Sequence, residues 1–140
     1  MRALGVDLGS KRIGIAVSDR SGTIASPLTV LQRTGNRRHD HRRIAELVAE
    51  EEAELVVVGL PLNMDGTTGP AATAAIAEAE ALATVVGVPV ETFDERRTTV
   101  TADAVLMERK MRAPARRQVI DKVAAAVMLQ GWLDRRSAGS

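Results

Sequence analysis

Two short apolar runs near the start of the chain, joined through a glycine-containing turn, constrain the fold more than any other feature. Ala3 to Val6 and Ile13 to Val17 each have the pattern of a buried strand. The four residues from Gly9 to Arg12 match the length of a hairpin loop. The sequence therefore predicts an antiparallel pair of strands, with Asp7 at the end of the first strand.

Asp7 is an acidic residue at the end of an apolar strand, beside a turn that carries Lys11 and Arg12. A buried carboxylate without a partner is costly, so this position calls for a cation, a hydrogen-bond donor or a bound metal. A second interpretation is that the Asp7 side chain caps the turn through backbone amides. The residues alone leave both interpretations open.

Length and composition narrow the class of protein. A chain of 140 residues predicts one domain with a sizeable core, over residues 1–136, followed by a loose tail over 137–140. No run of eighteen apolar residues is present, and the chain begins directly with a strand, so we expect neither a membrane span nor a leader. The absence of cysteine excludes disulfides and thiolate metal sites and favours a cytoplasmic protein.

Basic residues are grouped along the chain, although the net charge is only +1. Sixteen of the nineteen are arginine, which suits bidentate contacts to phosphate. The two groups are Arg33, Arg37, Arg38, Arg42 and Arg43, and Arg109, Lys110, Arg112, Arg116 and Arg117. The acids concentrate elsewhere, in Glu50–Glu54. Such segregation favours a polyanionic partner. The alternative is a solvated surface with helix ion pairs such as Arg42–Glu46.

Aromatic residues are almost absent from the chain, which contains only Phe93 and Trp132. Modules that bind single-stranded nucleic acid by base stacking need aromatic platforms. Any nucleic-acid binding by this chain should therefore depend on backbone charge and shape.

The rest of the chain alternates between strands and helices. The expected elements are a strand over 23–31, a helix over 38–53, a strand over 55–58, a helix over 70–86, a strand over 88–93, a helix over 98–109, a basic loop over 110–117 and a last helix to 136. Pro27 places the third strand at an edge or a bulge. The order predicts an α/β fold: a mixed five-stranded sheet, three antiparallel strands then two parallel ones, flanked by helices.

Acidic residues occur where strands of this sheet end. Functional loops of parallel strands lie at their carboxyl ends. Asp7 and Glu95 follow two such strands, and Asp121 is expected at the start of the last helix, so the three acids could converge. Convergent carboxylates protonate unless a cation offsets them. Hard oxygen ligands select Mg²⁺ or Mn²⁺, and two ions about 3.5–4 Å apart would support phosphodiester hydrolysis.

Each of these acids also has a simpler interpretation. Glu95 could form an exposed ion pair with Arg96. Asp121 could be a first-turn acid that complements the helix dipole. Asp94, next to Glu95, could share the metal or only cap the helix that follows.

Two further expectations concern side chains around these acids. The last helix should bury a stripe that lies just beside Asp121 and consists of Ile120, Val123, Ala124 and Val127. His39 and His41 have the wrong spacing for two ligands on one helical face, so both are predicted at the surface.

Four motifs along the chain match one known family. They lie at Gly5–Asp19, Val58–Thr67, Asp94–Thr99 and Asp121–Gln130, in order and with suitable gaps. On these motifs the sequence resembles the YqgF-type proteins of bacteria, also called RuvX. That family has an RNase H-like fold related to Holliday-junction resolvases.

The resemblance implies a metal-dependent nuclease with one RNase H-like domain that processes the 5′ end of pre-16S ribosomal RNA. Holliday-junction resolution is an older assignment for the family. The resemblance places Asp7, Glu95 and Asp121 at the catalytic metal-binding positions, with Mg²⁺ or Mn²⁺ as cofactor. The motif positions that would contact substrate in the same cleft are Lys11, Arg12, Asn63 and Arg96. Arg116 and Arg117, from the second basic group, are expected to contact phosphates.

Three hypotheses compete at this point. The first is a nuclease on structured RNA. The second is a nuclease on branched DNA, which would need a two-fold dimer for two symmetric cuts. The third is a non-catalytic assembly factor that holds ribosomal RNA through its arginines. Nothing identifies a dimer face, so the chain is expected to be a monomer or a homodimer, with Trp132 either at an interface or in the core.

Overall fold

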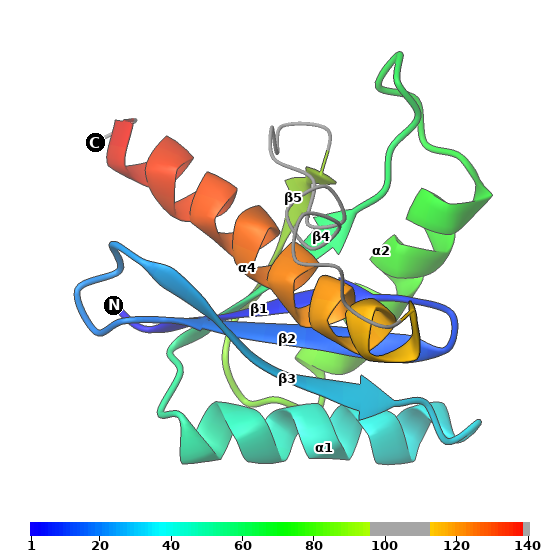
Figure 1. The fold of residues 1–140 in the computed structure, drawn as a ribbon, viewed down its shortest axis with the longest axis horizontal. Helices are drawn as coiled ribbons and strands as arrows, with labels where there is room; N and C mark the ends of the chain where they lie inside the picture. The colour runs from blue at the N-terminus through cyan, green and yellow to red at the C-terminus, as the bar shows by residue number, and fades with distance from the viewer. Residues whose placement is uncertain (96–112, 139–140) are drawn as a thin grey trace.

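The central sheet carries helices on both faces in the computed structural model, which describes residues 1–95 and 113–138 (Figure 1). The elements are β1 (Ala3–Leu8), β2 (Arg12–Ser18), β3 (Ala25–Gln32), α1 (Arg37–Glu50), β4 (Leu55–Leu60), α2 (Pro70–Ala83), β5 (Val90–Asp94) and α4 (Ala113–Ala138). The strand order is β3-β2-β1-β4-β5. β1 is central, antiparallel to β2 and parallel to β4, and β5 is parallel to β4. The predicted sheet is confirmed, while the helix expected over 98–109 lies outside the described residues.

The local geometry of the three antiparallel strands follows from a few residues. In the β1–β2 turn, the Gly9 amide donates to the Arg12 carbonyl oxygen at 2.9 Å. Pro27 pairs with Ala16 on the edge strand β3, next to a register shift between Ile15 and Ala16. Because proline donates no ladder hydrogen bond, it is tolerated at this edge, as predicted.

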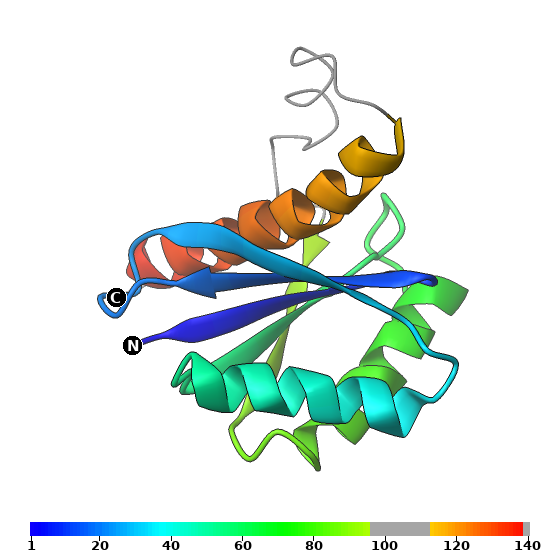
Figure 2. The ribbon, with the colours of Figure 1, turned by 60° about the horizontal axis from the view of Figure 1, so that its bottom comes forward.

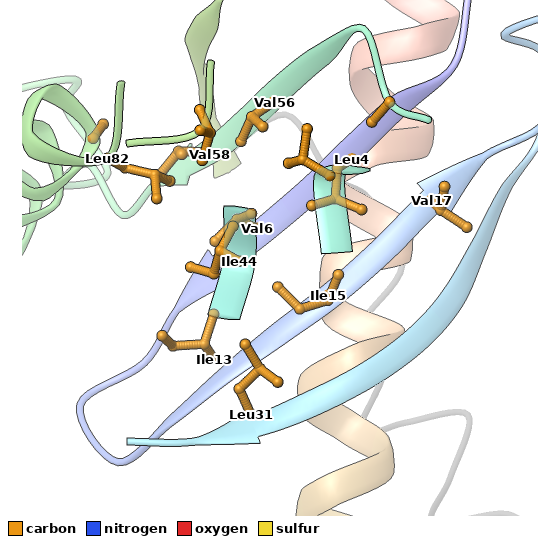
Figure 3. Close-up of a cluster of buried hydrophobic side chains, with 14 residues drawn as sticks. Leu4, Val6, Ile13, Ile15, Val17, Leu31, Ile44, Val56, Val58 and Leu82 are labelled. Atoms are coloured by element: carbon orange, nitrogen blue, oxygen red, sulfur yellow. The ribbon is translucent and has the colours of Figure 1, made fainter. Parts of the chain in front are cut away.

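One face of the sheet packs against α1 and α2, which lie together on one side in Figure 2. Alternate strand residues point to this face because successive side chains of a strand project to opposite sides. Leu4 and Val6 of β1 belong to this core, together with Ile44 of α1 and Leu82 of α2 (Figure 3). Each of these four side chains is fully buried.

α4 crosses the opposite face of the sheet and packs on β1, β2 and β3 (Figure 2). The second core combines Ala16 and Val57 from the sheet with Leu129 and Trp132 from the helix. A Cβ atom on Gly5 would lie only 2.9 Å from the Leu129 Cβ. The missing side chain on β1 therefore lets the helix approach the sheet closely. Trp132 is 8% exposed, which supports its interpretation as a core residue.

One expectation for the last helix is wrong. α4 begins at Ala113, so residues 113–117 are helical where a loop was expected, while its end at Ala138 is close to the expected end near 136. Pro114 does not prevent this, since proline is tolerated in the first turn of a helix. Within the part of the chain that the structure describes, no helix has the length and apolar character needed to cross a membrane.

The buried stripe of α4 also differs from the expected one. Its buried members are Ala125, Ala126, Met128, Leu129, Trp132 and Leu133, whereas Ile120, Val123, Ala124 and Val127 are only half-buried. Both sets satisfy helical spacing. The small residues of β1 and β2 decide between them, because they determine which side of the helix can come closest to the sheet.

Candidate active site

Asp7 and Glu95 reach the same side of the sheet because of strand alternation. Leu4 and Val6 face α1 and α2, so Asp7 faces α4. Phe93 of β5 belongs to the α4-side core, and Glu95 follows it by two residues. A Cβ atom on Gly59 of β4 would lie 2.5 Å from the Glu95 Oε1. The Glu95 carboxyl group therefore lies over β4, next to the central strand that carries Asp7.

Asp121 is brought to this end of the sheet by close packing of α4 on β2. A Cβ atom on Gly14 would lie 2.0 Å from the backbone oxygen of Asp121, and Gly14 pairs directly with Asp7. Asp121 thus lies opposite Asp7 across the β1–β2 pair. It stands more than two turns inside α4, so its interpretation as a first-turn acid is wrong.

The Asp7 and Glu95 carboxyl groups share a hydrogen bond and influence each other's protonation. Burial, the charge of Asp7 and the hydrogen bond to Asp7 raise the pKa of Glu95 to about 8, and the charge of Asp94 adds to this. Burial also raises the pKa of Asp7; the hydrogen bond from Glu95 opposes that rise, and the charge of Asp121 reinforces it. With a pKa of about 8, Glu95 keeps its proton at neutral pH and donates it to Asp7 in this hydrogen bond.

The third acid is neutralised by a basic residue of the turn. Arg12 Nε donates to Asp121 Oδ2 at 2.5 Å, and each side chain is about a quarter exposed, at 26% and 27%. Because a guanidinium has five N–H donors, this contact leaves the two Nη groups of Arg12 available. Neither has a protein partner among the described residues.

The three acids do not surround a common point in this conformation. In residues 1–95 and 113–138, no group of three acidic or histidine side chains is arranged to hold a metal ion. Asp7 contacts Glu95, while Asp121 contacts Arg12. The predicted cluster is therefore only partly formed. Two hard carboxyl groups that share a single proton nevertheless suit a divalent cation, which can replace that proton.

The raised pKa of Glu95 predicts how stability depends on pH in the presence of a chelator. The unfolded chain loses the Glu95 proton near pH 4.5, whereas the folded protein keeps it to about pH 8. The stabilisation is therefore complete below pH 4.5 and is lost as pH rises through about 8, at up to about 1.4 kcal/mol per pH unit for one proton. Urea unfolding in EDTA at pH 5.5, 7 and 8.5 should show this decline. Glu95→Gln should flatten it, and an equally steep decline in that variant would contradict the assignment.

The other predicted substrate residues come from several segments of the chain. Lys11 is exposed on the β1–β2 turn. Asn63, in the β4–α2 loop, donates from Nδ2 to the Thr67 Oγ1 at 3.0 Å, so its amide closes its own loop. Arg96 lies outside the described residues. Arg116 and Arg117 belong to α4, and their side chains lie outside the description.

A buried polar network near this end of the sheet was not predicted. Arg33 donates from Nη1 and Nη2 to the two Glu78 carboxylate oxygens at 2.9 Å each, and His41 Nε2 lies 2.8 Å from Glu78 Oε2. His41 is only 2% exposed, so its predicted surface position is wrong. Burial acts to raise the pKa of Glu78, but the bonds and charges of Arg33 and His41 together hold it below its usual value.

A signal for this network was present in the sequence. Glu78 lies on the apolar stripe of α2 with Ala75, Ala79 and Leu82, where an acid needs buried partners. The partners are Arg33, which directly follows β3, and His41 of α1, so spacing along the chain could not identify them.

Known proteins match nearly the whole of this chain. The model of the family described as RuvX, Holliday junction resolvase, matches residues 1–135. The chain belongs to the RuvX family. Relatives that carry the name "Putative pre-16S rRNA nuclease" include one from Myxococcus xanthus, 48% identical over 134 residues that cover 96% of this chain and 88% of the relative. Another, from Moorella thermoacetica, is 50% identical over 135 residues that cover 96% of each chain.

Solved structures confirm the fold of this RuvX family member. Thermus thermophilus RuvC in complex with a Holliday junction matches with a TM-score of 0.63 and 20% identity, covering 100% of this chain and 98% of RuvC. A second RuvC structure from that organism matches with a TM-score of 0.60 and 19% identity, covering 99% and 97% of the two chains. The predicted RNase H-like architecture is thus shared over the whole RuvX chain.

Proposed function

We propose that this protein is a divalent-metal-dependent nuclease that hydrolyses phosphodiester bonds at the 5′ end of pre-16S ribosomal RNA in the cytoplasm. The observation that carries the proposal is the Asp7–Glu95 pair at the carboxyl end of the central strand, with Asp121 beside it. The family membership and the names of the relatives support a nuclease and this RNA.

In this proposal Asp7 and Glu95 would hold the ion, and Asp121 would complete the ligand set if it were free of Arg12. A bound Mg²⁺ or Mn²⁺ supplies positive charge that activates water and stabilises the attacking and leaving oxygens. Glu95 holds its proton in the hydrogen bond to Asp7, and binding of a cation by this pair would release that proton to water. Arg12, on the adjacent turn, binds a phosphate oxygen through its two Nη groups.

The distribution of charge supports a polyanionic substrate at this end of the molecule. Glu51 and Glu52 pair with Arg2 and Arg20. Arg2 directly precedes β1, so these acids lie at the end of the sheet away from Asp7. The carboxyl end of β1 instead carries Lys11 and Arg12 on its turn. Glu51 and Glu52 are therefore held away from the candidate site, and the Arg42–Glu46 ion pair of the alternative interpretation is not formed among the described residues.

A side-by-side digestion tests the proposal. A pre-16S RNA with its 5′ extension and a four-way DNA junction are incubated with the protein in Mg²⁺, Mn²⁺ or EDTA. We expect 5′ processing of the RNA in either metal and none in EDTA. Cleavage that persists in EDTA would contradict the role of the carboxyl pair.

Junction resolution is the second candidate, and the description of the matching family favours it. It predicts paired symmetric cuts in the DNA junction and a two-fold dimer in solution. Preferential cleavage of the junction would establish this second function. If neither substrate is cut while RNA is still bound, the protein is a non-catalytic assembly factor.

A second prediction concerns the first turns of α4. Replacing Arg116 and Arg117 together with alanine should weaken binding to all RNA sequences alike, because phosphate contacts carry no sequence information. The dependence of log affinity on log salt should become shallower by about 0.7 for each phosphate that is no longer neutralised. Filter binding in EDTA over a range of NaCl concentrations measures this slope. An unchanged slope would mean that these arginines do not contact phosphates.

A further inference from the structure

A pocket of about 480 Å³ lies next to the β1–β2 turn, and none of Asp7, Glu95 and Asp121 lines it. Its lining includes Ser10, Lys11, Gln32, Arg33, Arg37 and Asp40. These residues come from the β1–β2 turn, the end of β3 and the start of α1, which lie at one end of the molecule in both views (Figures 1 and 2). It is the end of β1 that carries Asp7.

The charged groups of the pocket leave positive charge at its mouth. Lys11 and Arg37 are exposed, and neither forms an ion pair in the described part of the chain. Arg33 is offset by Glu78, at 2.9 Å. The Asp40 carboxylate accepts hydrogen bonds from the Thr34 hydroxyl at 2.8 Å and from the Thr34 amide at 3.2 Å. One positive charge is therefore in excess, which matches the single negative charge of a phosphodiester.

A rigid buried network holds the walls of this pocket. Arg33 Nε donates to the Gly9 carbonyl oxygen at 2.7 Å, and the Arg33 amide donates to the Lys11 carbonyl oxygen at 2.9 Å. Asp40, His41 and Glu78 are three of the four buried polar or charged residues in the described ranges, and all three lie in or directly behind the wall. Buried polar groups are costly unless fully bonded, and fully bonded networks hold a site in a fixed geometry. The nuclease chemistry does not use this network.

From this we infer that the Lys11–Arg37 pocket binds a backbone phosphate of the nucleic-acid strand whose scissile phosphate lies at Asp7 and Glu95. The inference rests on the proposed function and adds a second contact point to it. Arg12 turns toward Asp121 on the α4 side, while its neighbour Lys11 lines the pocket on the other side of the turn. A strand that crosses the turn meets both residues. The contact positions the strand and reads no sequence.

The test is the binding of a 5′-extended pre-16S RNA in EDTA over a range of NaCl concentrations. The double variant Lys11→Ala, Arg37→Ala should bind about tenfold more weakly at low salt, with a salt slope shallower by about 0.7–0.9 because one phosphate fewer is neutralised. Arg42→Ala is the matched control, because Arg42 is exposed on the same helix but does not line the pocket. It should change the slope by much less. The stability of the double variant should match that of the parent, since neither side chain forms an ion pair in the described ranges.

An unchanged slope in the double variant, or an equal change in Arg42→Ala, would overturn the inference. A thermal-stability measurement with inorganic phosphate distinguishes free phosphate from a backbone phosphate as the ligand of the pocket. If inorganic phosphate stabilises the parent but not the double variant, while RNA binding is equal in both, the pocket binds free phosphate and the inference fails. Because binding is measured without metal, failure of cleavage would refute the proposed function and leave this result intact.

Discussion

Asp7→Asn should abolish metal-supported cleavage, with a loss of roughly 10³-fold or more in kcat, while the fold and RNA affinity stay close to those of the parent. The reason is that Asp7 interacts with both other acids: it forms a hydrogen bond with Glu95, and the charge of Asp121 raises its pKa. An amide is a poor ligand for a hard cation, and several kcal/mol of transition-state stabilisation correspond to this rate loss. The asparagine oxygen can still accept the hydrogen bond from Glu95, so folding should be retained.

The measurement is single-turnover cleavage of the pre-16S RNA in Mg²⁺, with RNA affinity determined separately in EDTA. Asp134→Asn is a matched control, because Asp134 is exposed on α4 and the substituted amide can still accept the Gln130 bond. Its activity should equal that of the parent. Parent-like cleavage by Asp7→Asn would remove Asp7 from the catalytic role, and loss of RNA binding would point to a structural role.

Gly14→Ala should be the most damaging substitution for the fold. The new Cβ would lie 2.0 Å from the Asp121 backbone oxygen and 2.6 Å from its carbonyl carbon, so α4 must move away from β2. Overpacking against a side chain typically costs about 1–3 kcal/mol, and a helix backbone yields less readily, so we expect a loss of roughly 3 kcal/mol or more. Cleavage should fall with it, because Asp121 and its contact with Arg12 move with the helix.

Urea unfolding measures the stability of Gly14→Ala, and Gly35→Ala supplies the comparison. Gly35 has a φ of +86° and no atom within 4 Å of an added Cβ, so alanine there meets backbone strain without a clash. That strain costs roughly 1–2 kcal/mol. If the two variants lose equal stability, close packing of α4 on Gly14 is not what holds the helix in place.

Most of the fold was predictable because it depends on local pattern. Alternating and continuous apolar runs identified all five strands, and the short Gly9–Arg12 turn required β1 and β2 to be antiparallel. Pro27 correctly marked an edge strand, since the loss of one N–H donor is tolerated only there. The last helix was less predictable. Its start at Ala113 was missed, because Pro114 and the nearby arginines resemble a loop although proline is compatible with a first helical turn.

For the site, the acids and their strand ends were evident from the motifs, but their partners were not. The pairing of Arg12 with Asp121 joins residues 109 positions apart. The burial of His41 depends on Glu78, which belongs to another helix. Side chains that meet only across packed elements leave no periodic signal in the chain.

The sequence by itself determined the order of the strands along the chain and the position of Asp7 at the end of the first one, because each depends on residues that are neighbours in the chain. Only the tertiary structure decided which face of α4 meets the sheet, which acid holds the shared proton and which cation neutralises Asp121. The physical reason is that segments distant in the chain approach each other closely. Because glycine has no side chain, Gly14 leaves room for the backbone of α4 and Gly59 leaves room for the Glu95 carboxyl group. The burial of the carboxyl groups and the short distances between their charges then determine which of them is protonated.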